Sequence, residues 1–305
     1  MRKNMEKNTW KDMDADYRLI RVIGEGAFSR IYLAEGRGGQ QCACKVSKDV
    51  KMLRQEAEIL GSLYHPLFPV FMGYGENRRE GRLFMEYIPG RSLGKAMRIR
   101  GKFSPRQTMR IAGELADGLR YLHERQPAIL YRDLKPENIM LCENGRVKLI
   151  DLGCACCLDA QDGAKVGTPG FAPPEQLASG GIAGIYSDVY GLGKTIQNIM
   201  MEERRCHGKG RFSAGKAYGR KQKCCILGKK CLIAERKRFK EEKRCRCRLE
   251  RMIEIAGRDD FRQRPQDMAE ILCILTGQRK AEKEIICEKN IWESCYKNPC
   301  SLPLI

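Results

Sequence analysis

The chain has 305 residues and a mass of 34.8 kDa, and its 57 Lys and Arg against 38 Asp and Glu give a net charge of +19. A hydrophobic content of 42% argues against a disordered chain, and the length fits one large domain or two small ones. No apolar run reaches the length of a membrane span or a signal peptide, so we expect no transmembrane segment and a cytoplasmic protein. Sixteen cysteines in such a chain favour reduced thiols over a disulfide scaffold.

The positive charge is concentrated in one segment. Residues 202–251 hold 19 Lys and Arg against 6 Asp and Glu, a local net charge of +13 that leaves +6 for the rest of the chain. A high positive charge can serve solubility alone, or it can bind an anionic partner. Its concentration indicates that something is inserted or added at this segment.

A polar leader at 1–16 precedes a predicted small sheet. Alternating apolar residues predict strands over 17–23, 30–34 and 41–46, and a turn that contains glycine separates the first two. A change to helical spacing predicts a helix over 51–63. Two further apolar runs, around 69–74 and 82–88, complete the sheet.

Beyond the sheet the helical period dominates. Helices are predicted over 105–124, 187–201, 249–257 and 265–275. We therefore expect an α+β fold with two lobes. The expected boundaries are 17–88 for a β-rich N-lobe, 89–277 for an α-rich C-lobe with a basic Cys-rich insertion at about 202–248, and 278–305 for a C-terminal tail.

The segment 24–31, Gly-Glu-Gly-Ala-Phe-Ser-Arg-Ile, lies between the first two predicted strands. Two glycines let the backbone approach a phosphate closely, and the strands on either side would make the turn a flap over a nucleotide. The other interpretation is an ordinary hairpin. Ser29 stands where a third glycine is expected.

Lys45 ends the third predicted strand, where an unpaired ammonium is costly to bury. A carboxylate of the following helix would compensate for it. Of the candidates Glu56 and Glu58 we prefer Glu56, because it lies near the apolar stripe of that helix. The alternative is a surface lysine with unrelated acids.

The segments 130–141 and 147–153 carry the chemistry that decides the prediction. Asp133, Lys135 and Asn138 share one predicted loop ahead of a short strand, while Asp151 follows the next strand. An enzyme that moves a phosphoryl group needs a carboxylate to orient a hydroxyl, a cation beside the phosphate, and an amide with a carboxylate to hold Mg²⁺. The chain has all four at the right spacing.

With these motifs the chain resembles a eukaryotic-type (Hanks-type) protein kinase, and within that group the Ser/Thr kinases found in bacteria as well as in eukaryotes. The likeness covers roughly 17–277 apart from the basic stretch, and Lys135 in Arg-Asp-Leu-Lys-Pro-Glu-Asn matches the Ser/Thr branch. It implies a bilobal fold, transfer of the γ-phosphate of ATP to protein Ser/Thr hydroxyls, including autophosphorylation, and the use of Mg²⁺.

The resemblance also implies roles for single residues. Asp133 would be the catalytic base and Lys135 would contact the γ-phosphate, while Lys45 would bind the α/β-phosphates and pair with Glu56. The remaining residues form two sets: the magnesium ligands Asn138 and Asp151, and the ATP-binding residues of the glycine loop, strands, gatekeeper and hinge, which are Gly24, Glu25, Gly26, Ala27, Phe28, Ser29, Ile31, Ala43, Lys45, Met85, Glu86, Ile88 and Met140.

Structural residues are implied in the same way. Thr168 of the substrate-facing loop would lie near the catalytic Asp and Lys, Glu175 would pair with Arg264, and Asp188 would cap the catalytic loop from a buried helix. The stacked apolar residues that run through both lobes would be Leu60, Phe71, Tyr131 and Leu152.

Four positions depart from the family pattern without removing a group that handles phosphate or metal: Ser29, Tyr131, Leu152 and Pro173. We therefore expect an active kinase. A second hypothesis is a nucleotide-binding pseudokinase-like scaffold that recruits an anionic partner through the basic segment. A third, phosphorylation of a small molecule, is disfavoured by Lys135 and the complete substrate-facing loop at 168–175.

The activation segment at 154–166 contains no Ser, Thr or Tyr. Phosphorylation there cannot order it against Arg132, which is how many relatives are controlled. Our hypothesis is that Asp159 or Asp162 supplies the negative charge or that the short loop orders itself. Its three cysteines, Cys154, Cys156 and Cys157, are either small apolar fillers or sensitive to oxidation.

The basic segment makes the distance from Asp188 to Arg264, 76 positions, longer than is usual in the family. An exposed basic helix over 234–251 is predicted, used to dock an acidic substrate protein, RNA or anionic lipid. The alternative is that the charged face of this helix is only solvated and binds no partner. Structural zinc is weakly supported, since the cysteines do not form two CxxC pairs.

Overall fold

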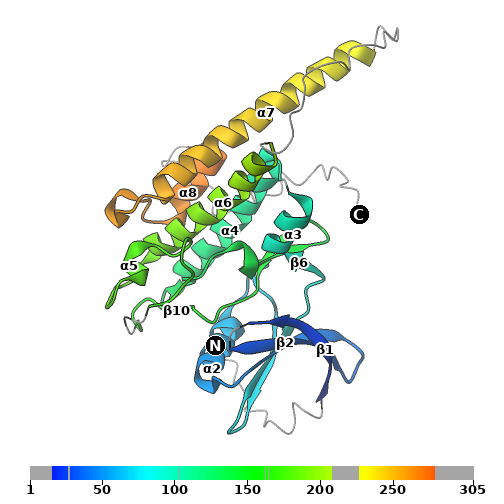
Figure 1. Cartoon of the computed structure of the whole chain (residues 1–305), viewed down its shortest axis with the longest axis vertical. Helices are drawn as coiled ribbons and strands as arrows, with labels where there is room; N and C mark the ends of the chain where they lie inside the picture. Colours follow the sequence, from blue (N-terminus) through cyan, green and yellow to red (C-terminus); the bar gives the residue numbers. More distant parts are fainter. Residues whose placement is uncertain are drawn as a thin grey trace.

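The computed structural model describes residues 16–26, 28–101, 103–161, 163, 165–207 and 227–278, and shows a small β-rich lobe joined to a larger helical lobe (Figure 1). The expected leader and C-terminal tail lie almost wholly outside these residues. The N-lobe is an antiparallel sheet in the order β1-β2-β3-β5-β4 with one helix. Its elements are β1 (Tyr17–Glu25), β2 (Ser29–Gly36), β3 (Gln41–Ser47), α2 (Val50–Ser62), β4 (Phe71–Glu76) and β5 (Gly81–Glu86).

Helix α2 begins and ends where its flanking residues dictate. The side chain of Asp49 caps it by accepting a hydrogen bond from the Met52 N–H at 2.9 Å, and an extended residue, Leu63, ends it. Its buried face carries Leu53, Ala57 and Leu60, and Glu56 lies on the same face. A carboxylate is therefore carried into the interior beside the sheet.

The C-lobe is mainly helical and contains two small sheets. Ser104 and Gln107 form a capping box at the start of its central helix, α4. The helices are α3 (Leu93–Arg100), α4 (Pro105–His123), α5 (Pro174–Leu177), α6 (Ile185–His207), α7 (Leu227–Ala256) and α8 (Met268–Thr276). One sheet has the order β6-β8-β9 and the other pairs β10 with β7; their strands are β6 (Gly90–Ser92), β7 (Ile129–Leu130), β8 (Ile139–Cys142), β9 (Val147–Leu149) and β10 (Cys156–Cys157).

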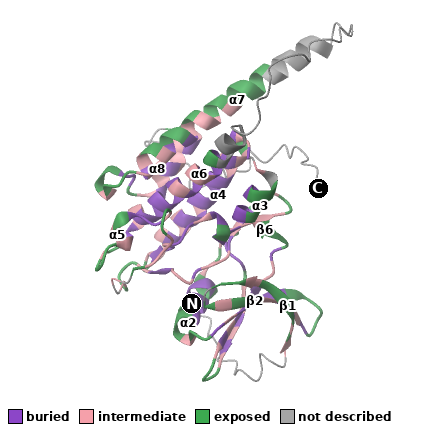
Figure 2. Ribbon diagram, in the orientation of Figure 1, coloured by how far each residue is buried: buried purple, intermediate pink, exposed green. Residues whose placement is uncertain are grey.

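One apolar cluster runs through both lobes, as the buried residues in Figure 2 show. Leu60 from α2, Tyr131 from the catalytic loop and Leu152 beside the activation segment belong to it, and Phe71 of β4 packs against it. The residues of the stack inferred from the resemblance thus lie within continuous packing that includes both lobes.

Two predicted helix boundaries differ from the structure. The basic helix at 234–251 and the helix at 249–257 are parts of one helix, α7, because no Gly or Pro interrupts the chain from 229 to 256. The last helix begins at Met268 rather than at 265, because Asp267 caps it by accepting from the Glu270 N–H at 2.7 Å. Residues 208–226 of the expected insertion lie outside the described residues. Among the helices that the structure describes, none is both long and apolar enough to cross a membrane.

Candidate active site

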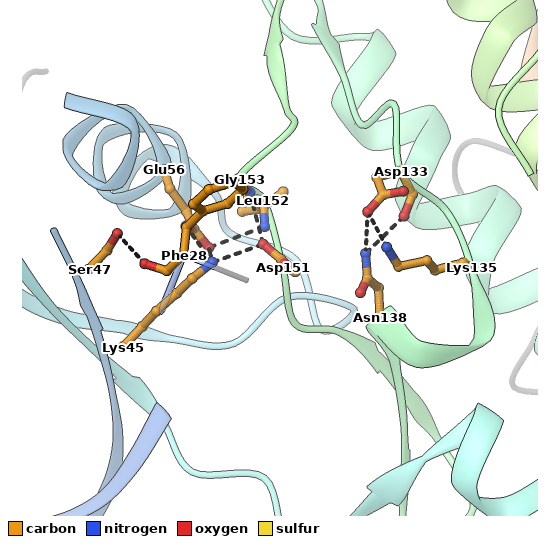
Figure 3. A network of polar contacts seen from close by, with 10 residues as sticks. All are labelled: Phe28, Lys45, Ser47, Glu56, Asp133, Lys135, Asn138, Asp151, Leu152 and Gly153. Atoms are coloured by element: carbon orange, nitrogen blue, oxygen red, sulfur yellow. Dashed lines mark hydrogen bonds and ion pairs between the residues drawn. The ribbon is translucent and has the colours of Figure 1, made fainter. Parts of the chain in front are cut away.

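Lys45 on β3 forms the centre of a buried ion-pair network (Figure 3). Its Nζ lies 2.9 and 2.7 Å from the two carboxylate oxygens of Glu56, and 2.9 Å from Oδ1 of Asp151. Both Lys45 and Glu56 are buried, at 7% and 3% exposure, and Leu152 N–H donates to Glu56 Oε1 at 3.3 Å. Of the two helix acids considered from the sequence, Glu56 is the one that the structure brings to Lys45.

Ionisation in this network follows from burial and charge together. Burial lowers the pKa of the Lys45 ammonium, but Glu56 and Asp151 outweigh this and hold the pKa well above its usual value. Burial also acts to raise the pKa of Asp151, and here the Lys45 ammonium prevails, so that the pKa of Asp151 is lowered. For Glu56, burial raises the carboxyl pKa against the pull of Lys45; since Glu56 accepts two hydrogen bonds from that ammonium, we take the pair as ionised.

Asp133 lies in the loop between β7 and β8 with its carboxylate held on both oxygens. The Thr168 hydroxyl donates to Oδ1 at 2.6 Å, Lys135 Nζ donates to Oδ2 at 2.7 Å, and Asn138 Nδ2 donates to Oδ2 at 3.0 Å. Lys135 also donates to the Thr168 hydroxyl oxygen at 2.7 Å. A carboxylate, an ammonium and a hydroxyl thus lie within one hydrogen-bond network.

Asn138 and Asp151 lie at the same end of one small sheet. Asn138 directly precedes β8 and Asp151 follows β9, and these strands pair antiparallel, with Ile150 N–H donating to Asn138 O at 3.0 Å. The Asn138 amide nitrogen is taken by Asp133, whereas the carbonyl oxygen remains an acceptor. Asp151 uses Oδ1 for Lys45 and for the Gly153 N–H, and Oδ2 has no partner among the described residues. Carboxylate and amide oxygens are ligands that Mg²⁺ takes, so the donor set fits that ion.

The backbone ahead of Asp133 is strained and is fixed by Asp188 of α6. Arg132 has φ of 67°, a left-handed conformation that is uncommon for residues other than glycine. Asp188 accepts from the N–H groups of Tyr131 and Arg132 at 2.9 and 2.8 Å, and its Oδ2 lies 2.8 Å from His123 Nε2. Three contacts to one buried carboxylate therefore hold the turn that presents Asp133.

The segment expected to cover a nucleotide forms the turn between β1 and β2. Gly24 pairs with Ile31 across the two strands, and Gly26 N–H donates to Ser29 O at 2.8 Å. Phe28 at the tip is 79% exposed. Of the expected ATP-binding residues, Ala27 lies outside the described residues; Glu25, Ser29 and Ile31 lie on this hairpin, Ala43 and Lys45 on β3, Met85 and Glu86 at the end of β5, Ile88 just beyond it, and Met140 on β8.

The C-lobe carries a further buried ion pair. Arg264 donates to both carboxylate oxygens of Glu175, at 2.6 and 3.0 Å, and the Ser187 hydroxyl donates to the same carboxylate at 2.9 Å. The arrangement is bidentate and Arg264 is 3% exposed. It ties α5, which follows the substrate-facing loop, to the segment ahead of α8.

The activation segment contacts the catalytic loop and β7 through its backbone. Arg132 Nε donates to the backbone carbonyl of Cys154 at 2.6 Å, and β10 pairs with β7. Asp159 is exposed, and Asp162 lies outside the described residues. Burial raises the pKa of the Cys154 thiol, and Asp133 and Asp151 add to the shift, which disfavours the reactive thiolate there. Among the described residues no cluster of three or more His, Cys, Asp or Glu could hold a metal ion.

Two residues in this region are not predicted by the sequence. His123, at the end of α4, contacts Asp188, and Gln176, directly after Glu175, donates to two backbone carbonyls. The only signal available for Gln176 was its place beside an expected ion-pair residue.

A family model described as "Protein kinase domain" matches residues 17–273. The chain is 35% identical over 175 residues to "cAMP-dependent protein kinase catalytic subunit PRKX" of Mus musculus, which covers 54% of this chain and 49% of the relative. It is 34% identical over 213 residues to "Salt tolerance receptor-like cytoplasmic kinase 1" of Oryza sativa subsp. japonica (63% and 58%) and 30% identical over 203 residues to "Serine/threonine-protein kinase PrkC" of Bacillus subtilis (strain 168) (62% and 31%). The aligned part thus covers less than two thirds of each relative. The chain belongs to the protein kinase family.

Proposed function

We propose that this chain is an active Ser/Thr protein kinase that transfers the γ-phosphate of ATP to Ser and Thr hydroxyls of proteins, its own included. The observation that carries the proposal is the network around Asp133, in which a carboxylate and the Lys135 ammonium both contact a hydroxyl, at 2.6 and 2.7 Å. The relatives support the same chemistry, because the three that are named in the preceding subsection are all kinases by name.

Each charged group then has a role in positioning and in stabilising charge. Asp133 accepts a hydrogen bond from the acceptor hydroxyl and aims its oxygen, while Lys135 balances negative charge on the transferred group. Lys45, held by Glu56, holds the α/β-phosphates, and Ala43, Ile31 and Met140 contact the adenine ring. Asn138 and Asp151 would hold Mg²⁺, which supplies neutralisation of phosphate charge when it is bound.

Acceptor identity tests the Ser/Thr part of the proposal. Incubation with radiolabelled ATP and a mixed peptide library, followed by analysis of the phosphorylated residues, should give phosphoserine and phosphothreonine. Dominant phosphotyrosine would contradict the acceptor class. A label found only on an added small molecule such as an aminoglycoside would instead favour that substrate class.

The exposed face of α7 supports a second proposal, docking of an acidic segment of a substrate protein. Arg236, Lys240, Lys243, Arg244 and Arg251 are exposed and recur at helical spacing on one face. In the C-terminal part of α7, which lies against the helical lobe, the opposite face is buried (Figure 2). The buried residues are Leu249, Met252 and Ala256.

Glu241 and Glu242 lie off this face by helical spacing, whereas Glu250 and Glu254 are exposed at its C-terminal end, beyond Arg244. Glu241 lies 3.9 Å from Arg106, and Glu242 lies 3.7 Å from Arg238. From Arg236 to Arg244 the stripe therefore presents cations along one line. This fits an extended acidic peptide better than a bilayer, because a membrane-bound helix needs a continuous exposed apolar face and Phe239 alone does not form one.

This docking is tested with Arg236→Glu/Lys240→Glu/Arg244→Glu and, as a control, reversal of the distant exposed Arg78 and Arg79. The triple variant should raise KM for a substrate with an acidic tail at least about tenfold at low salt, and leave KM for a short neutral peptide unchanged. Equal KM values for the acidic substrate would contradict docking. Tighter salt-dependent binding of RNA or anionic vesicles by the wild type would point to another partner class.

A cytoplasmic location is the last part of the proposal. Nine cysteines among the described residues form no disulfide. Cysteines persist as thiols in a reducing compartment, which supports this location. Fractionation of cells that express the chain tests it.

A further inference from the structure

Gln176 on α5 lies between two loops that the reaction needs. Its side chain is 2% exposed, and Nε2 donates to the carbonyl of Arg132 at 2.6 Å and to that of Val166 at 2.8 Å. The first carbonyl belongs to the peptide unit that leads into Asp133. The second lies two residues before Thr168, whose hydroxyl contacts Asp133.

The orientation of this amide follows from its surroundings. Both neighbours are carbonyl oxygens, so the NH₂ group, which has two donors, must face them. Oε1 is buried without a partner among the described residues. The amide thus leaves one acceptor unpaired and in return makes two hydrogen bonds that join separate loops.

Gly167 allows this close approach. Its φ is 99°, and a Cβ added to it would lie 2.4 Å from Gln176 Nε2, 2.8 Å from the Ala172 Cβ and 3.0 Å from the Arg132 carbonyl oxygen. Only glycine leaves room for the amide to reach both loops. The backbone before Asp133 is then held from two sides, by Asp188 at the Arg132 N–H and by Gln176 at the Arg132 carbonyl.

We propose that Gln176 is a positioning residue for phosphoryl transfer: its amide fixes the catalytic loop and the substrate-facing loop relative to each other. The inference rests on the proposed kinase function. No Ser, Thr or Tyr lies at 154–166 to be phosphorylated, so a neutral clamp supplies order that many relatives obtain from a phosphate. Gln176 touches none of the groups assigned to ATP, so it acts on the transfer step.

The test compares kcat and the KM for ATP in two variants of the full chain and a control. Gln176→Leu removes both donors at similar size, and kcat should fall about 100-fold while KM for ATP is unchanged. The control is Gln266→Leu, because Gln266 Nε2 also donates to two carbonyls, those of Phe261 and Arg264 at 2.9 and 2.7 Å, away from Asp133. The control should keep the wild-type kcat.

Gln176→Glu gives a readout that a purely structural role would not move. As a carboxylate it has no donor, whereas protonation restores one O–H donor. Because the site is 2% exposed, burial raises the pKa of the new carboxyl, and kcat relative to the wild type should rise as the pH falls from about 8 to about 6.

Three results would count against the positioning role of Gln176. Wild-type kcat in Gln176→Leu, or a flat pH ratio in Gln176→Glu, would overturn it, and so would a failure of both variants to fold while Gln266→Leu folds. If the wild type transfers no phosphate, the proposed function fails. If the wild type is active and Gln176→Leu is equally active, only the positioning role fails.

Discussion

Lys45 and Glu56 depend on each other, because each exposes less than a tenth of its surface. Lys45→Met leaves the Glu56 carboxylate buried without its counter-charge, so we expect a loss of about 3 to 5 kcal/mol of unfolding free energy in addition to lost activity. Adding Glu56→Leu should restore much of the stability and none of the activity. Urea unfolding checks this, and a double variant less stable than Lys45→Met would contradict it.

Individual residues of the site differ in how well the sequence predicts them. Lys45, Asp133, Asn138 and Asp151 were predictable because the chemistry of each depends on its own side chain at a characteristic spacing. Gln176 was not predictable, because its partners are backbone carbonyls, one of them 44 positions away. Every residue has a backbone carbonyl, so the sequence does not indicate which ones Gln176 contacts.

At the scale of elements, the loop after α2 is joined to α4 through Asp117. The hydrogen bond from His65, at 3.3 Å, and that from Arg120, at 3.1 Å, lower the pKa of Asp117 against the opposing effect of burial. A lowered pKa stabilises the fold above the unfolded value of about 3.9, and this contribution is lost as the pH falls through the folded value.

Asp117→Asn should therefore cost up to about 1 kcal/mol of unfolding free energy near neutral pH and progressively less below about pH 4. Urea unfolding of wild type and variant across this range measures the difference. If the difference in unfolding free energy between wild type and variant stays constant down to about pH 3, the charge of Asp117 does not contribute to stability.

The activation segment is the second element with a prediction of its own. Arg132 donates to the Cys154 carbonyl, and the Gln161 side chain is bonded to both the N–H and the carbonyl of Ala183, at 2.9 Å each. We propose that these contacts order the segment. Phosphatase treatment of the purified enzyme should leave the rate of peptide phosphorylation unchanged, whereas a collapse of activity would contradict this hypothesis.

At the scale of the whole molecule, the sequence predicts the two lobes and most helices because the periodicity of each element is local. It does not predict that α7 is one helix of 30 residues, since the charge of its exposed half and the apolar face of its buried half look like separate elements. The net charge of +19 is thus largely a property of one segment, and the catalytic fold is close to neutral by comparison.

The most direct test of the kinase proposal is the initial rate of γ-phosphate transfer to a Ser/Thr protein substrate by the wild type beside Asp133→Asn. The variant keeps the size of the side chain and removes its charge, so fold and ATP binding should persist while the rate falls by about 10² to 10⁴. Equal low rates in both proteins, with ATP still bound, would contradict an active kinase and favour the scaffold.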